Sequence, residues 1–112
     1  MKKLEIIIKS EKLDDLKSIL DECNANGLMI TNIMGYGNQK GYKQIYRGTE
    51  YSVNLLPKIK VETVVATELS EKIIERVTKE INTGNYGDGK IFIYDVEDAV
   101  RIRTGERGHD AL

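Results

Sequence analysis

The apolar residues of this chain follow the periods strand, helix and strand twice over, and this doubling constrains the fold more than any other feature. In the first round, apolar residues alternate over 4–8, recur every third or fourth position over 13–23, and alternate again over 29–34. The second round repeats the order over 58–96. Two such units predict an α+β fold of the ferredoxin-like βαββαβ type, in which two helices pack on one face of an antiparallel sheet.

Local signals predict where these elements begin and end. Ser10 can cap the first helix, and Asn26 and Gly27 are expected to end it, because they tolerate left-handed geometry. The second helix is expected to start near Ser70, and a short last strand is expected over 100–104.

The face of the sheet that carries no helix must also be covered or polar. We expect Ile30 and Val64 to lie on that face, which would make it partly apolar and would favour self-association.

Composition limits the classes of function. The 112 residues are expected to form a single domain, 1–112, and the net charge of −1 does not favour a nucleic-acid binder. Apolar runs are too short for a membrane span and no secretory leader pattern is seen, so a cytoplasmic location is expected. Cys23 is the only cysteine, so an intrachain disulfide is excluded and a buried apolar role is expected.

A glycine-rich segment before the last main strand has the composition of a phosphate-binding loop. Gly84, Gly87 and Gly89 lack a Cβ and precede Lys90, so backbone amides and an ammonium could surround a phosphate. The spacing imitates a P-loop, but isoleucine follows where Ser or Thr would hold magnesium, and the loop leads from helix to strand. A Walker-type NTPase is therefore not favoured. Phosphate binding of another kind and a plain tight turn both stay open.

A segment of twenty-one residues, 37–57, joins the two halves, where roughly two to five residues would close a hairpin. Four of the six tyrosines fall within 36–51, with glycines and charged residues but few aliphatic ones. We expect this loop to be mobile alone and to become ordered against a partner, since Tyr and Arg combine contact area with directional hydrogen bonds. The alternative is an insertion without a role.

Three motifs resemble those of the PII nitrogen-regulatory signal-transduction proteins, of the GlnB/GlnK type. The hexapeptide 46–51, Tyr-Arg-Gly-Thr-Glu-Tyr, is similar to the modification segment of that family. The glycine loop, 82–90, is similar to its second signature, and 101–106, Arg-Ile-Arg-Thr-Gly-Glu, is similar to its C-terminal segment. The resemblance covers essentially the whole chain without a gap.

The resemblance implies a homotrimer of ferredoxin-like subunits with a nucleotide site in each intersubunit cleft. Each cleft would be built from the loop 82–90 and the base of the loop 37–57 of one subunit, and closed by the C-terminal segment, 101–112, of a neighbour. The family binds ATP and ADP in competition, and 2-oxoglutarate together with Mg-ATP. Its members regulate by binding and are not enzymes. The implied targets are an ammonium transporter, or a nitrogen-assimilation enzyme or regulator.

The resemblance also assigns residues to the nucleotide. Arg101 and Arg103, if they alternate on a strand, would fork onto phosphate oxygens, although alone they could be an exposed charged edge. Ile7 and Val64 would line the adenine, and Glu62 would accept from the ribose hydroxyls. The full implied set is Ile7, Gly35, Gly37, Asn38, Gln39, Glu62, Val64, Gly87, Asp88, Gly89, Lys90, Arg101 and Arg103.

A second implied set would hold 2-oxoglutarate. Its magnesium ligand would be the side-chain carbonyl of Gln39, and Lys58 would receive the distal carboxylate of the acid. Since nucleotide and acid share one metal ion, each should strengthen the binding of the other. Tyr86 adds bulk beside this site, where relatives carry an aliphatic residue. The set is Tyr36, Gln39, Lys40, Gly41, Lys58 and Gly87.

Two residues of the long loop receive roles from the resemblance alone. Tyr51 stands at the position that some relatives uridylylate, and Arg47 at the position that plugs an ammonium transporter. A small ATP-hydrolysing enzyme is the main alternative function, but His109, the only histidine, lies in the tail and no base for activating water is apparent. An RNA- or metal-binding ferredoxin-like module is a third class.

Overall fold

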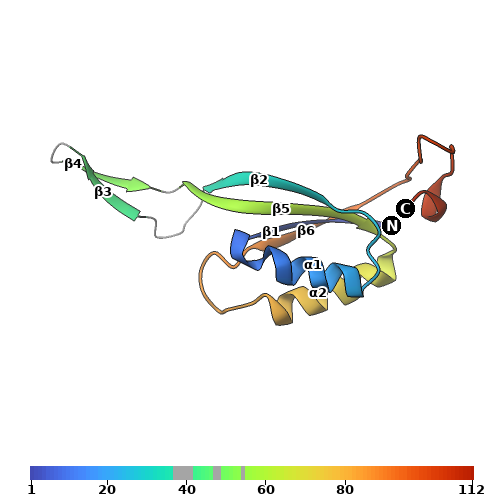
Figure 1. Cartoon of the computed structure of the whole chain (residues 1–112), viewed down its shortest axis with the longest axis horizontal. Coiled ribbons are helices and arrows are strands. Elements are labelled where there is room, and N and C mark those ends of the chain that lie inside the picture. The colour runs from blue at the N-terminus through green and yellow to red at the C-terminus, as the bar shows by residue number, and fades with distance from the viewer. Residues whose placement is uncertain (37–41, 47–48, 54) are drawn as a thin grey trace.

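The computed structural model describes residues 1–36, 42–46, 49–53 and 55–112, and for 42–46 and 49–53 it describes the backbone only. It confirms the ferredoxin-like α+β fold: four antiparallel strands form one sheet in the order β2-β5-β1-β6, and both helices lie on one face of it (Figure 1). The elements are β1 Lys2–Ile8, the 3₁₀ turn η1 Ser10–Lys12, α1 Leu13–Glu22, β2 Met29–Tyr36, β3 Tyr42–Tyr46, β4 Thr49–Val53, β5 Leu55–Val65, α2 Thr67–Glu80, β6 Lys90–Asp95 and the 3₁₀ turn η2 Gly108–Ala111.

The pairing register decides which side chains share a face. Glu5 of β1 lies opposite Glu62 of β5 and opposite Phe92 of β6, so these three point to the same side. On the other side of β1, Leu4, Ile6 and Ile8 point to the helices and are at most 2% exposed. The core consists of Leu4, Ile6, Ile8, Leu16, Ile19, Leu20, Cys23, Ile59, Val61, Val65, Ile73, Val77 and Ile81.

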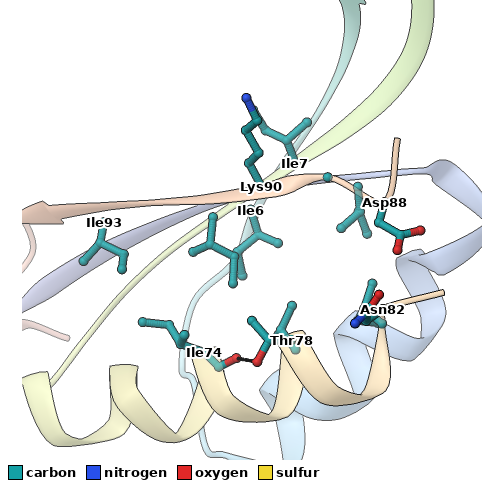
Figure 2. Close-up of a pocket in the computed structure, with 13 residues that line it drawn as sticks. Ile6, Ile7, Ile74, Thr78, Asn82, Asp88, Lys90 and Ile93 are labelled. Carbon is teal, nitrogen blue, oxygen red and sulfur yellow. Dashed lines mark hydrogen bonds between the residues drawn. The ribbon is translucent and has the colours of Figure 1, made fainter. Parts of the chain in front are cut away.

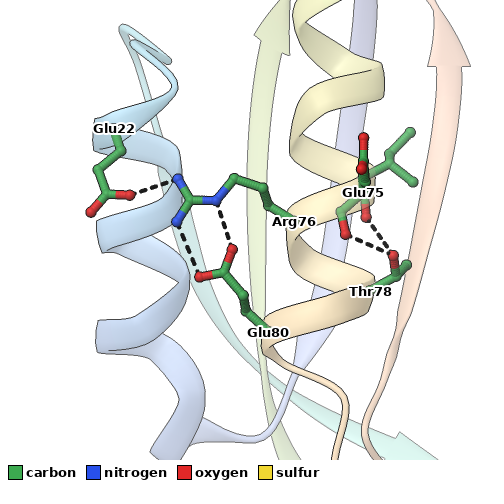
Figure 3. A network of polar contacts seen from close by, with 6 residues as sticks. Glu22, Glu75, Arg76, Thr78 and Glu80 are labelled. Atoms are coloured by element: carbon green, nitrogen blue, oxygen red, sulfur yellow. Dashed lines mark hydrogen bonds and ion pairs between the residues drawn. The ribbon is translucent and has the colours of Figure 1, made fainter.

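The helices are also joined on their outer side by one arginine. Arg76 of α2 contacts Glu22 of α1 with 2.6 Å between Nη1 and Oε2, and its Nε donates to Glu80 one turn later at 2.6 Å (Figure 3). Charged contacts therefore supplement the buried aliphatic seam where the two helices meet.

The first helix has different ends from those predicted. Ser10 does not cap it: this residue begins η1, and no side-chain hydrogen bond caps either element. The helix ends at Glu22, and Asn24, with φ of 60°, is the left-handed residue in place of Asn26 and Gly27. The amide of Ala25 donates to the carbonyl of Leu20 at 2.9 Å, which completes a Schellman ending around Asn24.

Two other predicted boundaries are also wrong. The second helix begins at Thr67, and Ser70 lies buried inside its first turn, where its hydroxyl donates to the Thr67 carbonyl at 2.6 Å. The predicted strand over 100–104 is absent from the described chain: Val100 makes an isolated bridge with Arg107, and the residues between them turn. The turn closes because the Arg107 guanidinium pairs with Asp98 at 2.5 Å.

The face opposite the helices is only partly as predicted. Val64 does lie on it, opposite Lys3, but Ile30 lies opposite Val61 and therefore on the helix side, at the edge strand. The open face carries Met29 instead, which is opposite Glu62 and 58% exposed. The prediction for Ile30 was wrong because the face of each β2 residue depends on the register in which β2 pairs with β5. A shift of that register by one residue exchanges the two faces.

The long loop is shorter than predicted and partly regular. Leu55, Leu56 and Pro57 belong to β5, since Leu55 pairs with Tyr36 at the end of β2. Within the loop, the backbones of β3 and β4 pair as an antiparallel hairpin that projects beyond one end of the sheet (Figure 1). None of the helices among the described residues is long and apolar enough to cross a membrane.

Candidate functional site

The glycine loop between α2 and β6 is closed by one of its own carboxylates. Asp88 accepts hydrogen bonds from the amides of Thr83 at 2.8 Å and Gly84 at 3.1 Å, and also from the Thr83 hydroxyl. The hydrogen bonds from Thr83, first from its hydroxyl and then from its amide, lower the pKa of the Asp88 carboxyl. These two amides therefore face an internal anion, and the backbone over 87–90 with the Lys90 ammonium is what this loop can offer to a phosphate.

Gly89 is required by a close approach of two backbones. Its φ is 119°, and a Cβ placed on it would lie 1.8 Å from the carbonyl oxygen of Ile7. The absence of a side chain lets the loop pass directly against β1, which fixes the start of β6 beside the end of β1.

Lys58 connects this loop to the strand that leaves the hairpin. The side chain is 8% exposed, and its Nζ donates to the carbonyl of Gly87 at 2.7 Å. Burial lowers the pKa of Lys58, and the positive charge of Lys9 lowers it further. A Cβ on Gly35 would approach the Lys58 chain to 3.3 Å, so glycine on β2 lets the lysine pass. A second positive charge near Lys58 favours the binding of an anion beside it.

Ile7 and Lys90 pair across β1 and β6, and both side chains point away from the helices (Figure 2). On the helix side of the same strands, an apolar cavity of about 390 Å³ separates β6 from Ile74 and Thr78 of α2. This cavity was not predicted. The Lys90 side chain points to the opposite face, but Asp88 and Gly89 of the glycine loop also line this cavity.

Glu62 and Val64 lie on the same open face as Ile7, but further along the strands. Ile7 lies opposite Lys60, so Glu62 is two residues and Val64 four residues further along the strands. These steps correspond to about 7 and 14 Å. Within one chain, Ile7 and Val64 therefore do not form two walls of the same small pocket.

The C-terminal segment, which contains Arg101 and Arg103, leaves the sheet at the end opposite to the glycine loop (Figure 1). The loop enters β6 opposite Ile7, whereas the C-terminal segment leaves β6 at Asp95, opposite Lys2. The two points are five residue steps apart along β6, which corresponds to about 17 Å. The guanidinium of Arg101 contacts Glu106 at 3.3 Å and donates to the Leu112 carbonyl at 3.0 Å, while Arg103 is exposed. One chain alone does not bring the two groups of residues together.

Several predicted residues lie outside the described part of the chain: Gly37, Asn38, Gln39, Lys40, Gly41 and Arg47. Of Tyr51 only the backbone is described, in β4 opposite Gln44. Tyr36 ends β2 and is 75% exposed, and Tyr86 on the glycine loop is 93% exposed.

Lys9 is a residue that the sequence analysis missed. Its charge acts on both Lys58 and Asp88. A signal was present, because Lys9 continues the alternation of Glu5 and Ile7 and so falls on the open face just past the end of β1.

Comparison with known proteins agrees with the resemblance seen in the motifs. The family model described as nitrogen regulatory protein P-II matches residues 1–106. Proteins named nitrogen regulatory protein P-II are similar over the full length of both chains: that of Rhodospirillum rubrum is 51% identical, that of Haemophilus influenzae 50% and that of Azospirillum brasilense 50%.

Proposed function

The chain belongs to the P-II family of nitrogen regulatory proteins, and from this premise we propose that it is a nucleotide- and 2-oxoglutarate-responsive regulator. ATP and ADP compete for one site, 2-oxoglutarate binds together with Mg-ATP, and the long loop transmits the bound state to a target protein. The relatives are named as regulatory proteins, which supports a function in binding and regulation. A homotrimer in the cytoplasm, acting on an ammonium transporter or a nitrogen-assimilation enzyme or regulator, belongs to the same proposal.

The nucleotide residues form two groups, and a second copy of the chain is needed to unite them. The backbone over 87–90 and the Lys90 ammonium would bind the phosphates, with Glu62 on the ribose. Arg101 and Arg103 would come from the neighbouring copy. Support comes from the separation of the two groups by the length of β6 within one chain. The Glu106 carboxylate contacts the guanidinium of Arg101, which is the group that would bind a phosphate. Arg101 therefore has to give up this contact before it can bind phosphate.

The contact between Lys58 and Gly87 is the observation that best supports the proposed coupling between 2-oxoglutarate, the glycine loop and the hairpin. It ties the glycine loop to β5, and β5 begins directly after the hairpin. A carboxylate that binds the Lys58 ammonium competes with the Gly87 carbonyl for it, so the acid acts on the nucleotide loop and on the base of the hairpin together. As the resemblance implies, magnesium would be held by the side-chain carbonyl of Gln39 and by oxygens of the ligands.

Calorimetric titration tests this function. ATP and ADP should each bind and displace one another, and 2-oxoglutarate should bind only when ATP and magnesium are both present. A Lys58→Gln variant should keep ATP binding and lose the acid, whereas Lys72→Gln, an exposed change on α2, should behave as wild type. No heat with either nucleotide at millimolar concentration, or equal binding of the acid without nucleotide, would refute the proposal.

A further inference from the structure

Five side chains on the open face form one connected cluster, which we call the open-face cluster: Lys3, Glu5, Lys60, Glu62 and Tyr94. They come from β1, β5 and β6, which the register places side by side. The Tyr94 hydroxyl donates to Glu5 at 2.7 Å, and the Lys3 ammonium lies 5.1 Å from the centre of the Tyr94 ring. The hydrogen bond from Tyr94 lowers the pKa of Glu5 and raises that of Tyr94.

The cluster contains a pair that is unfavourable by itself. Glu5 and Glu62 lie directly opposite each other on β1 and β5, where two like charges repel. Their side chains are 16% and 15% exposed. The Lys60 ammonium sits between them, 3.5 Å from Glu5 and 3.9 Å from Glu62. The arrangement of both carboxylates therefore depends on the groups that hold them apart.

The two carboxylates are held differently. Glu5 is held at both oxygens, with Lys60 at Oε1 and the Tyr94 hydroxyl at Oε2. Glu62 is held at one, because Lys3 at 3.2 Å and Lys60 both contact its Oε1. Among the described residues, no side chain contacts Oε2 of Glu62, so both of its lone pairs can accept hydrogen bonds, and its direction is set by the lysines on the other oxygen.

From this geometry we infer that Tyr94 is a positioning residue for ribonucleotide selectivity. By fixing Glu5, it fixes Lys60, and so it presents Oε2 of Glu62 to a ribose hydroxyl. The inference rests on the proposed nucleotide function and adds to it the residues that distinguish a ribonucleotide from a deoxynucleotide. A hydroxyl that donates to a carboxylate is strongly bound, and an analogue without it leaves the carboxylate unpaired.

The test is a change of selectivity, measured by titrating ATP, 2′-deoxy-ATP and 3′-deoxy-ATP. Wild type should bind at least one deoxy analogue about tenfold more weakly than ATP. In Tyr94→Phe, which removes only the hydroxyl, that ratio should fall by about threefold or more. Thr78→Val also removes one hydroxyl, from an exposed position on α2, and should leave the ratio unchanged.

A cycle with Glu62→Gln separates positioning from a general effect on the fold. The Tyr94→Phe change should no longer alter the ratio once Glu62 is glutamine, because its effect passes through that carboxylate. Glu5→Gln breaks the same connection with no loss of size, and serves as the second variant if Tyr94→Phe does not fold. An unchanged ratio in Tyr94→Phe and Glu5→Gln, or a full effect in the Glu62→Gln background, would overturn the inference.

The outcome also separates this inference from the proposed function. If wild type binds ATP and both deoxy analogues equally, the nucleotide function stands and the selectivity role of Glu62 and Tyr94 is refuted. If wild type binds none of the three, the proposed function itself has failed.

Discussion

Replacement of Gly89 by alanine should be far more damaging than replacement of Gly84 in the same loop. The new Cβ would lie 1.8 Å from the Ile7 carbonyl oxygen and 2.9 Å from its carbonyl carbon, so a backbone segment has to move. Alanine at φ of 119° is also strained. Backbone strain of about 1–3 kcal/mol and overpacking of about 1–3 kcal/mol give an expected loss of about 2–6 kcal/mol in the free energy of unfolding.

Two matched variants isolate the cause. Gly84→Ala has a positive φ of 80° but nothing within 4 Å of the new Cβ, so it should cost only the strain, about 1–2 kcal/mol. Gly27→Ala has neither a positive φ nor a close neighbour and should be neutral or slightly stabilising. Urea unfolding of the three variants measures the order. If Gly89→Ala unfolded at the same midpoint as Gly84→Ala, the backbone contact with Ile7 would not exist as described.

Three further predictions concern charged groups. Because its hydrogen bonds lower the pKa of Asp88 in the folded chain, the stability that they contribute is present above the unfolded-state pKa and is lost as the pH falls through the lower folded-state value. The difference in unfolding midpoint between wild type and Asp88→Asn should therefore shrink below about pH 4, and an undiminished difference at pH 3 would contradict this. Arg76→Ala should lower the thermal midpoint in low salt and much less in 1 M salt, since its partners are partly exposed; a salt-independent loss would point to packing instead. Arg103→Ala should weaken ATP binding by about tenfold in calorimetry at an unchanged unfolding midpoint, and unaltered affinity would exclude this residue from the site.

The fold could be predicted because the periods of apolar residues decide which face is buried. Alternation over β1 and β5 and the helical stripe of α2 required no tertiary knowledge, and they produced the correct sheet and core. The ends of the helices could not be predicted in the same way, because neighbouring residues compete for the left-handed position that ends a helix. Asn24, not Gly27, takes the left-handed position because the hydrogen bonds of the last helical turn close around it.

The predicted last strand failed for a physical reason. Val100 and Ile102 alternate with arginines as in an edge strand, but pairing requires a neighbour, and the main sheet ends near Asp95. The segment instead closes on itself through Asp98 and Arg107, which leaves Ile102 99% exposed. Local alternation does not reveal whether a partner strand is available.

The candidate site was predicted in composition more than in geometry. Glycines followed by Lys90 suggested a loop open to phosphate, whereas the Asp88 carboxylate occupies two of its amides. The family resemblance placed Lys58 and Gly87 in one set, but no local pattern could show that they are in contact, because twenty-nine positions separate them and only the packed sheet brings them together. Likewise, the separation of Arg101 from the glycine loop follows from the strand register.

The most direct test of the account is whether two defective chains can restore one another. Lys90→Ala removes the ammonium from the glycine loop, and Arg103→Ala removes the guanidinium from the opposite end, so neither variant alone should bind ATP well. If each site is shared between copies, unfolding and refolding the two together in equal amounts should restore about a quarter of the sites to wild-type affinity. Calorimetric titration of the mixture that found no sites of wild-type affinity, in assemblies shown to contain both variants, would contradict the account.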